Sequence, residues 1–269
     1  PTRSNFPMTR NIVTIAVLLG LFAAWSARSA QGQVAPGFRL FGPHGTGDTY
    51  LLDTNGAIVH TWPCAFNPGN AIYMLDNGDV LRTVSTPGGP GIGGSGGGIQ
   101  RIAFDGTVLW DFRYDGPGYF SHHDIIPMPS GSVLILAWEE KTAAEAIAPG
   151  RDPALLSGPV FMPEHLVEVV PTGLTTGTII WEWHLWDHLV QEFDPTKANY
   201  GVVANHPELL DINYPPVVLS NGDYNHANSL SYDPNRDLIL INSRDQNEFW
   251  IIDHSTTTAE AAGHSGGNH

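Results

Sequence analysis

The sequence predicts an all-β protein of the β-propeller class, and its composition and two repeated hairpin patterns carry this prediction. Only 14% of the 269 residues are charged, whereas helix-rich soluble proteins place many Glu and Lys residues on their outer faces. The chain has 30 glycines, 21 prolines and 8 tryptophans, a composition that suits many short strands joined by turns. The two hairpin patterns alternate along the chain and set its period.

The first pattern is an apolar strand, a turn with glycine, a β-branched strand and an aromatic residue. Asn55-Gly56 and Asp105-Gly106 predict tight hairpins, because both residues of such a pair favour positive φ. The copies of this first pattern are residues 49–62, 99–112, 166–183 and, more weakly, 249–263.

The second pattern is another hairpin, and its copies are residues 71–84, 124–138 and 229–242. Gly56 and Gly106 are 50 residues apart, and Gly78 and Gly131 are 53 apart. A period of about 50 residues with four strands is typical of a propeller blade. A β-sandwich also repeats hairpins, but it does not need two kinds in alternation. We therefore expect about four to five blades in this chain.

Two stretches interrupt the repeat. Residues 88–98 contain eight glycines in eleven positions and predict a flexible surface loop. Residues 184–216 predict an inserted excursion, with a short helix at about 186–193 and another turn near 206–210. Insertions of this kind sit on one face of a propeller and shape its binding mouth.

The N-terminal segment predicts export. Residues 12–25 form an uncharged apolar run, and about 20 such residues are needed to span a bilayer. Arg10 precedes the run and small residues follow it, which is the pattern of a secretory signal peptide. We expect residues 1–32 to be this signal region and the protein to be periplasmic or secreted, with no stable membrane span after cleavage. An uncleaved membrane anchor is the alternative.

Two further expectations concern the limits of the folded part. The chain begins with Pro1, and a start at Met8 would leave residues 1–7 upstream of the true start. The folded part is then a partial β-propeller over residues 33–269.

Charge and cysteine content exclude several classes of function. Asp and Glu number 27 against 12 Lys and Arg, for a net charge of −15, which disfavours nucleic-acid binding. The single Cys64 excludes a disulfide framework and a cysteine-based zinc site. No G-x-S-x-G elbow is present, and the glycine-rich stretch lacks the strand-to-helix context of a dinucleotide motif. Any chemistry must therefore come from the 12 histidines.

Two histidine sites precede equivalent strands. His122-His123 and His226 each stand directly before the first strand of a second-pattern hairpin. In a propeller the innermost strand of each blade lines the central channel, so His123 and His226 are expected to meet there. Arg244 lies at the far end of the hairpin that follows His226, which predicts that the two are neighbours. Imidazoles beside a guanidinium predict a cationic pocket for sulfate, phosphate or carboxylate.

The histidines of the insert leave two interpretations open. His184 and His188 are four residues apart and predict either a metal pair or an aromatic-packed pair, of which packing is favoured. We expect no metal site and no cofactor, and we keep His188 as a candidate substrate-binding residue. A metal-dependent propeller hydrolase with Ca²⁺ or Zn²⁺ is an alternative, disfavoured because no set of clustered carboxylates is evident.

Three segments carry a family resemblance. DYNHANSLSYDPNRDLILINSRDQNEFWIID at residues 223–253 resembles the signature of the bacterial aryl-sulfate sulfotransferase family. HHDIIPMPSGSVLIL at 122–136 is similar to an earlier histidine motif of that family, and WEWHLWDHLVQEFDPTKANYG at 181–201 resembles its insert. The resemblance extends over residues 45–269, and it is most specific at His-x-Asn-Ser and Ser-Arg-Asp.

The resemblance implies both a fold and a reaction. Family members are exported six-bladed propellers that move a sulfuryl group from an aryl sulfate ester to a phenolic acceptor. They do so through a histidine-bound intermediate, without a nucleotide sulfate donor, a metal or an organic cofactor. The expected partners are these two small molecules, with no nucleic acid.

The resemblance also assigns roles. His226 and Arg244 match the sulfate-binding pair, and His123, with His122 as the alternative, matches a third channel histidine. Asn228 is expected to orient His226. Protonated His226 and His123 would donate to the bridging phenolic oxygen, and nearby Trp and Tyr residues would stack on the phenyl rings.

One feature of the family pattern is missing. The sulfated histidine belongs to a later motif, and nothing like it follows residue 253. We therefore expect a C-terminally incomplete chain that lacks the nucleophile and does not turn over by itself. The competing hypothesis is a secreted, non-catalytic propeller that binds a partner or a glycan.

Overall fold

The computed structural model describes residues 36–94, 96–215 and 222–264, and all its strands and helices belong to one unit, Phe38–His269. Strands dominate this unit, and the longest helix among the described residues has five residues, so the predicted all-β class is confirmed. The predicted signal region, residues 1–32, lies outside the described residues.

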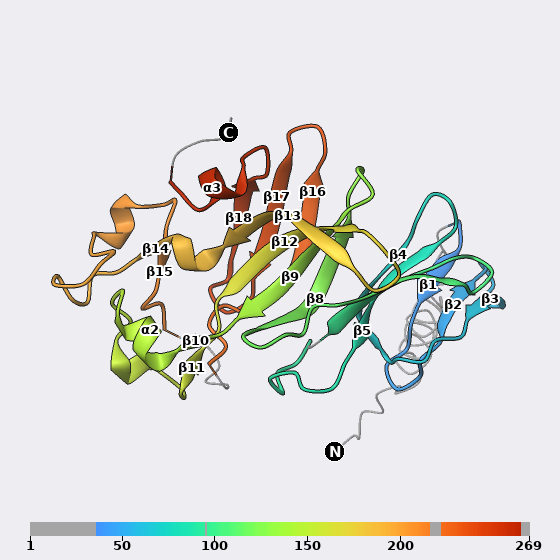
Figure 1. The fold of residues 1–269 in the computed structure, drawn as a ribbon, viewed down its shortest axis with the longest axis horizontal. Coiled ribbons are helices and arrows are strands. Elements are labelled where there is room, and N and C mark those ends of the chain that lie inside the picture. Colours follow the sequence, from blue (N-terminus) through green and yellow to red (C-terminus); the bar gives the residue numbers. More distant parts are fainter. Residues whose placement is uncertain (1–35, 95, 216–221, 265–269) are drawn as a thin grey trace, which may run out of the picture. The chain divides into compact units, whose positions relative to one another are not determined.

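The first two sheets are antiparallel meanders in which consecutive strands are neighbours (Figure 1). The first sheet contains β1 (Arg39–Phe41), β2 (Thr49–Leu52) and β3 (Ile58–Trp62). The second contains β4 (Pro68–Met74), β5 (Val80–Ser85), β6 (Gly97–Ile102) and β7 (Val108–Arg113).

The next two large sheets are also antiparallel, and the third has the longer strands. The third has the order β8 (Tyr119–Pro127), β9 (Val133–Glu139), β12 (Glu164–Pro171) and β13 (Gly177–His184). The fourth contains β16 (Ala227–Asp233), β17 (Leu238–Ser243) and β18 (Glu248–Asp253). The weaker copy of the first pattern, residues 249–263, forms β18 and then helix α3 (Thr258–Ala261) instead of a second strand.

Two insertions interrupt the succession of large sheets. Between β9 and β12 the chain forms β10 (Lys141–Thr142), helix α2 (Ala143–Ile147), a 3₁₀ turn (Pro153–Leu155) and β11 (Val160–Phe161). Between β13 and β16 it forms 3₁₀ turns at Leu185–Asp187 and Val203–Asn205, and the short strands β14 (Leu189–Val190) and β15 (Leu210–Asp211).

The helix predicted at 186–193 is therefore wrong. Leu189 and Val190 are buried and pair in parallel with residues 210–211. The amide N–H of Leu210 donates to His188 O at 2.8 Å, and that of Ile212 donates to Val190 O at 3.0 Å. This pairing satisfies the backbone groups that a helix would otherwise have satisfied internally.

Four hairpins share one turn. In each, a glycine N–H donates to the carbonyl three residues earlier, and that glycine has a positive φ. The glycines are Gly56 (φ +83°), Gly78 (φ +87°), Gly106 (φ +91°) and Gly131 (φ +88°). Asn55 and Asp105 keep negative φ, so the predicted turns with two left-handed residues are replaced by a turn with one left-handed glycine. The glycine spacing of the sequence repeat is thus the spacing of these turns.

The apolar core lies between successive sheets, and β9 shows this most clearly. Val133 and Ile135 face a cluster shared with the second sheet, whereas Leu134 and Leu136 face a cluster shared with the fourth. The third sheet is therefore covered on both faces, whereas each sheet of a two-sheet sandwich packs on one face only. This arrangement of antiparallel sheets is consistent with a β-propeller-like domain.

The aromatic residue of the first pattern joins each sheet to the next. Trp62 on β3, Trp110 on β7 and Trp181 on β13 each donate the indole N–H to a carbonyl of the following sheet or of its last turn. All three N···O distances are 3.0 Å, and the acceptors are Ala103, Thr176 and Thr256. The aromatic residue of the sequence repeat therefore makes the same kind of contact between sheets in each of these copies.

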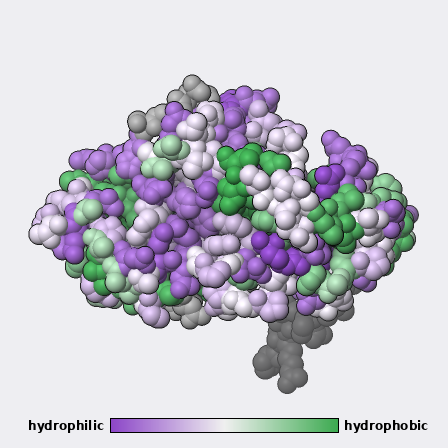
Figure 2. Space-filling model, in the orientation of Figure 1, coloured by the Kyte–Doolittle hydropathy of each residue, from purple (hydrophilic) through white to green (hydrophobic). Residues whose placement is uncertain are grey.

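Exposed apolar side chains occur on the last strand of each large sheet. Examples are Ile58 on β3, Leu109 on β7, Ile180 on β13 and Ile251 on β18. On the face drawn in Figure 2, hydrophobic patches alternate with hydrophilic ones. Scattered exposure of this kind is ordinary and does not define a binding surface. Among the described residues, no helix has the length and apolar character needed to cross a bilayer.

Candidate functional site

The first strands of three sheets are tied together by one aspartate. Strand β8 packs against both β4 and β16. The Asp124 carboxylate on β8 accepts from the Tyr73 hydroxyl of β4 at 3.0 Å and from the Leu230 amide N–H of β16 at 2.9 Å. These three strands are thereby held in a fixed relation to one another.

Backbone irregularities aim two histidines at each other. His123 lies in a bulge of β8, not before the strand as the sequence predicts, and His226 lies just before a bulge in β16. Both have a positive φ, +46° and +45°. A bulge re-aims a side chain out of the regular alternation. The two imidazoles meet edge to face with 4.9 Å between ring centroids, although 103 residues separate them in the sequence.

His122 occupies a buried position beside this pair. Its ring stacks on Trp138 at 3.8 Å between centroids. Its Nε2 is 2.6 Å from Glu164 Oε2, and its Nδ1 is 2.9 Å from Nδ1 of His123. The other oxygen of Glu164 accepts from the Ala227 amide N–H at 2.7 Å. The chain of contacts therefore runs from β8 through Glu164 on β12 to the start of β16.

Burial sets the protonation of this group. It lowers the pKa of His122 and of His123 to about 3 each, so both rings are neutral at neutral pH. For His123, the neighbouring histidines and Arg244 contribute to this lowering after burial. Burial, with the nearby Asp223 carboxylate, raises the pKa of Glu164 well above its ordinary value.

Two acidic residues orient the other members of the site. Asp223 accepts from Nδ1–H of His226, which directs Nε2 of that ring away from the carboxylate. Asp245 accepts from Nε–H of Arg244 at 2.6 Å, a bond that uses none of the N–H groups on the two terminal nitrogens. The Arg244 amide N–H donates to His226 O at 3.3 Å, so the hairpin brings Arg244 beside His226.

The lowered pKa values of His122 and His123 reduce the positive charge expected for the predicted cationic pocket. His122 and His123 are neutral, so these two rings add no positive charge to that of Arg244. Buried carboxyl groups of Asp223 and Asp245 accompany it. That protonated His123 donates to a leaving group stays a prediction, which the lowered pKa of this ring disfavours.

The aromatic residues near the motifs are mostly structural. Trp138 is 1% exposed and stacks on His122, and Tyr224 is 2% exposed and packs on Phe161. A cavity of about 110 Å³ borders Trp138, with Tyr119 and Met162 among its lining residues. Stacking on a substrate ring by Trp138 or Tyr224 would require them to leave these contacts.

The glycine-rich stretch is part of the site and not only a surface loop. The His123 amide N–H donates to Gly94 O at 2.9 Å. A Cβ atom on Gly94 would lie 1.9 Å from Cε1 of His123, so only glycine fits against this ring. Ile92 is 8% exposed, and Gly97 and Gly98 belong to β6.

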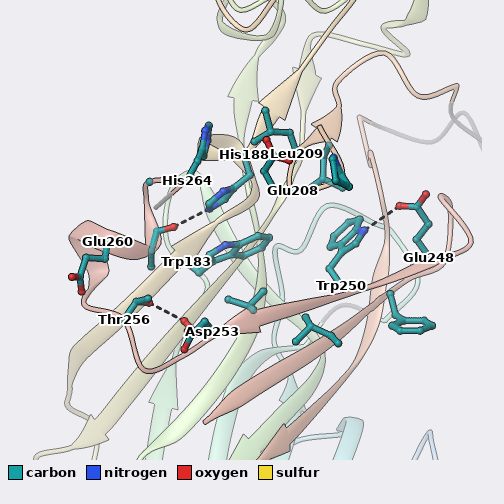
Figure 3. A pocket seen from close by; sticks show the side chains of 17 residues that line it. Trp183, His188, Glu208, Leu209, Glu248, Trp250, Asp253, Thr256, Glu260 and His264 are labelled. Atoms are coloured by element: carbon teal, nitrogen blue, oxygen red, sulfur yellow. Dashed lines mark hydrogen bonds between the residues drawn. The ribbon is translucent and has the colours of Figure 1, made fainter. Parts of the chain in front are cut away.

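His188 lies away from this cluster. It lines a pocket of about 500 Å³ along β18, together with Trp183, Trp250 and His264 (Figure 3). Its Nε2 is 2.8 Å from Ala261 O, and its ring stacks on Trp183 at 5.2 Å between centroids. The lining of this pocket includes none of His122, His123, His226 and Arg244. The structure therefore does not bring His188 together with the other predicted site residues.

Asn228 does not contact the His226 ring in the way the sequence predicts, and an acidic residue does so instead. Asn228 lies at the bulge of β16, but the contact to the His226 ring comes from Asp223. Asp223 and Asp245 stand inside the quoted motifs, so their proximity to His226 and Arg244 in sequence was a usable signal. No such signal pointed to Glu164.

No group of three or more His, Cys, Asp or Glu side chains in the described ranges is arranged to hold a metal ion.

Comparison with known proteins decides the family. A family model described as arylsulfotransferase (ASST) matches residues 28–260. The chain belongs to the arylsulfotransferase family. This assignment supports a transferase function of the arylsulfotransferase type at the level of the family.

Other comparisons add little to the family assignment. A crystal structure of a protein of unknown function from Bacteroides caccae aligns with 82% of this chain and 74% of that chain, at 12% identity and a TM-score of 0.37. No curated protein matches the chain.

Proposed function

We propose that this arylsulfotransferase-family protein is an exported enzyme that moves a sulfuryl group from an aryl sulfate ester to a phenol. The observation that supports this proposal is that His123 in the bulge of β8, His226 just before β16 and Arg244 just after β17 lie close together. These side chains come from two sheets, and their convergence serves no evident need of the apolar core.

Arg244 is suited to hold the sulfate group. A guanidinium binds tetrahedral oxyanions through paired N–H groups. Asp245 accepts from Nε–H, which fixes the plane of the guanidinium while leaving the terminal N–H groups to face a ligand. The side chain of Arg244 is 43% exposed, so an anion from solvent can reach it.

The histidines contact the transferred group through ring nitrogens. Asp223 holds Nδ1–H of His226, so Nε2 is the nitrogen that meets substrate. His123 is neutral, and it acts as an uncharged donor or acceptor. Sulfuryl transfer resembles phosphoryl transfer, in which positioning and charge stabilisation supply most of the catalysis.

The proposed route has two steps. A neutral imidazole nitrogen displaces the donor phenolate and takes up the sulfuryl group, and the acceptor phenol then removes it. The family resemblance assigns the nucleophile to a histidine of a later motif. His123, His226 and Arg244 are then the groups that hold the sulfuryl oxygens and handle the protons.

The test is an assay of transfer from 4-nitrophenyl sulfate to phenol by the full-length protein. The rate is measured as release of 4-nitrophenol. Loss of a hydrogen-bond donor that stabilises charge in the transition state typically lowers kcat by about 100-fold or more. We expect a loss of this size for Arg244→Ala and for His226→Ala. Arg236→Ala is the matched control, since Arg236 is exposed at the turn of the same hairpin and pairs with Asp233. Rates equal to wild type in both site variants would reject the proposal.

A further inference from the structure

Glu164, His122 and His123 form an unbroken hydrogen-bonded series. Glu164 Oε2 lies 2.6 Å from His122 Nε2, and His122 Nδ1 lies 2.9 Å from His123 Nδ1. Glu164 and His122 have fully buried side chains, and Trp138 covers one face of the His122 ring. The series thus joins a carboxyl group that water does not reach to the partly exposed His123.

The contact between the two Nδ1 atoms restricts the positions of the ring protons. In an N···N hydrogen bond one nitrogen carries the proton and the other accepts it. Since both rings are neutral, each carries one proton, and only two arrangements satisfy every contact.

The two arrangements differ in what His123 presents at Nε2. If Glu164 is a carboxylate, it accepts from Nε2–H of His122. His122 Nδ1 then accepts from Nδ1–H of His123, and His123 Nε2 carries a lone pair. If Glu164 is protonated, every bond reverses, and His123 Nε2 carries a proton.

We propose that Glu164 is a positioning residue that stores one proton and sets whether His123 Nε2 serves as acid or as base. This inference rests on the proposed function. It assigns Glu164 a role through His122 and His123, without contact between Glu164 and substrate.

The proton balance closes over one reaction cycle. In the first step the aryl O–S bond breaks, and a histidine N–S bond forms. The leaving phenolate oxygen takes the proton of His123 Nε2, while protons shift from His122 Nδ1 to His123 Nδ1 and from Glu164 to His122 Nε2. In the second step the acceptor phenol gives its proton to His123 Nε2, its oxygen takes the sulfuryl group, and the series returns the proton to Glu164.

The surroundings of Glu164 suit both of its protonation states. Asp223 and Asp245 add negative charge nearby and favour the protonated form, whereas His226 favours the carboxylate. The Ala227 amide N–H donates to Oε1 at 2.7 Å, and that oxygen accepts whether or not Oε2 carries a proton. The carboxyl group can therefore change its charge without moving.

Imidazole ¹⁵N NMR of the full-length protein tests the proposal without substrate. In the wild type, His123 should change from the Nε2–H to the Nδ1–H tautomer as pH rises and Glu164 ionises. Glu164→Gln cannot ionise. Its amide oxygen takes the place of Oε1 at Ala227, and its NH₂ group faces His122. We expect His123 to stay in the Nε2–H form at every pH in this variant, and a tautomer change like that of the wild type would overturn the proposal.

Two further variants test whether the tautomer change of His123 depends on Glu164 and His122 specifically. Glu168→Gln is the matched control, because Glu168 is also on β12 and also contacts a histidine, His254 at 2.9 Å, outside the series. It should leave the His123 tautomer change intact, and loss of the change would count against a role specific to Glu164. If Glu164→Gln does not fold, His122→Phe keeps a ring against Trp138 and interrupts the series. Persistence of the tautomer change in that variant would also overturn the proposal.

Activity separates this inference from the proposed function. Glu164→Gln should lower transfer from phenyl sulfate by about 100-fold, the usual contribution of proton transfer, and lower transfer from 4-nitrophenyl sulfate less, because nitrophenolate leaves without a proton. Equal losses for the two donors would overturn the inference and leave the function standing. An inactive wild type whose His123 tautomer still switches would reject the function and retain the proton series.

Discussion

At the scale of single residues, Gly94 tests whether the glycine-rich stretch positions His123. Its φ is +85°, and an added Cβ would lie 1.9 Å from the His123 ring. Gly94→Ala must therefore move the ring or the loop. We expect sulfuryl transfer to fall by roughly 10- to 100-fold, since misplacement of a reacting group by about 1 Å has effects of this size.

Gly91→Ala is the control for backbone strain. Gly91 also has a positive φ, +73°, but a Cβ there would meet nothing within 4 Å. Both substitutions carry a similar backbone cost of about 1 kcal/mol, which urea denaturation would measure. Equal transfer rates in the two variants would show that contact with His123 does not matter.

The residues of the site differ in how far the sequence could predict them. His226 and Arg244 could be paired because a hairpin of known length returns the chain to its start. His123 could be placed with them because it holds the equivalent position in another copy of the pattern. Glu164 could not be predicted, because its contact with His122 spans 42 residues and depends on the register of β9 and β12.

At the scale of elements, the inter-sheet tryptophans give a prediction about stability. Trp110 is buried, and its indole N–H donates to Thr176 O at 3.0 Å. Trp110→Phe removes this donor and some packed volume, which should lower the free energy of unfolding by roughly 1–3 kcal/mol. Urea denaturation should show a lower midpoint with an unchanged slope.

Trp250→Phe provides the comparison. Its indole N–H donates to the exposed Glu248 carboxylate at 3.1 Å, so water can replace that bond. We expect less than about 1 kcal/mol for this substitution. A loss for Trp110→Phe no greater than that for Trp250→Phe would contradict a stabilising role of the Trp110 hydrogen bond between sheets.

The sequence predicted the strands better than the helices. Strand pairs and their glycine turns repeat, so each copy supports the others. The helix predicted at 186–193 had no such support, and strand pairing with residues 210–211 prevailed. Helix α2 was missed, although Thr142 and Glu145 form a capping box that is readable in the sequence.

At the scale of the whole unit, His254 links the third and fourth sheets in a way that depends on pH. Its Nε2 is 2.9 Å from Glu168 on β12, and its Nδ1 is 2.7 Å from Asp237 just before β17. Trp181 and Tyr232 pack edge-on against its ring. Although burial opposes the charged form, the two carboxylates outweigh it and raise the pKa of His254.

The sign of the effect follows from the raised pKa. The charged ring stabilises the folded state fully below about 6.5, the unfolded pKa of histidine, and this stabilisation is lost as pH rises through the folded value. In urea denaturation, the stability difference between wild type and His254→Gln should therefore be larger at pH 6 than at pH 9. His206→Gln should show little difference at either pH, because the pair of His206 with Glu208 is exposed. A His254→Gln difference that stays constant between the two pH values would mean that shape, and not charge, holds these sheets together at this point.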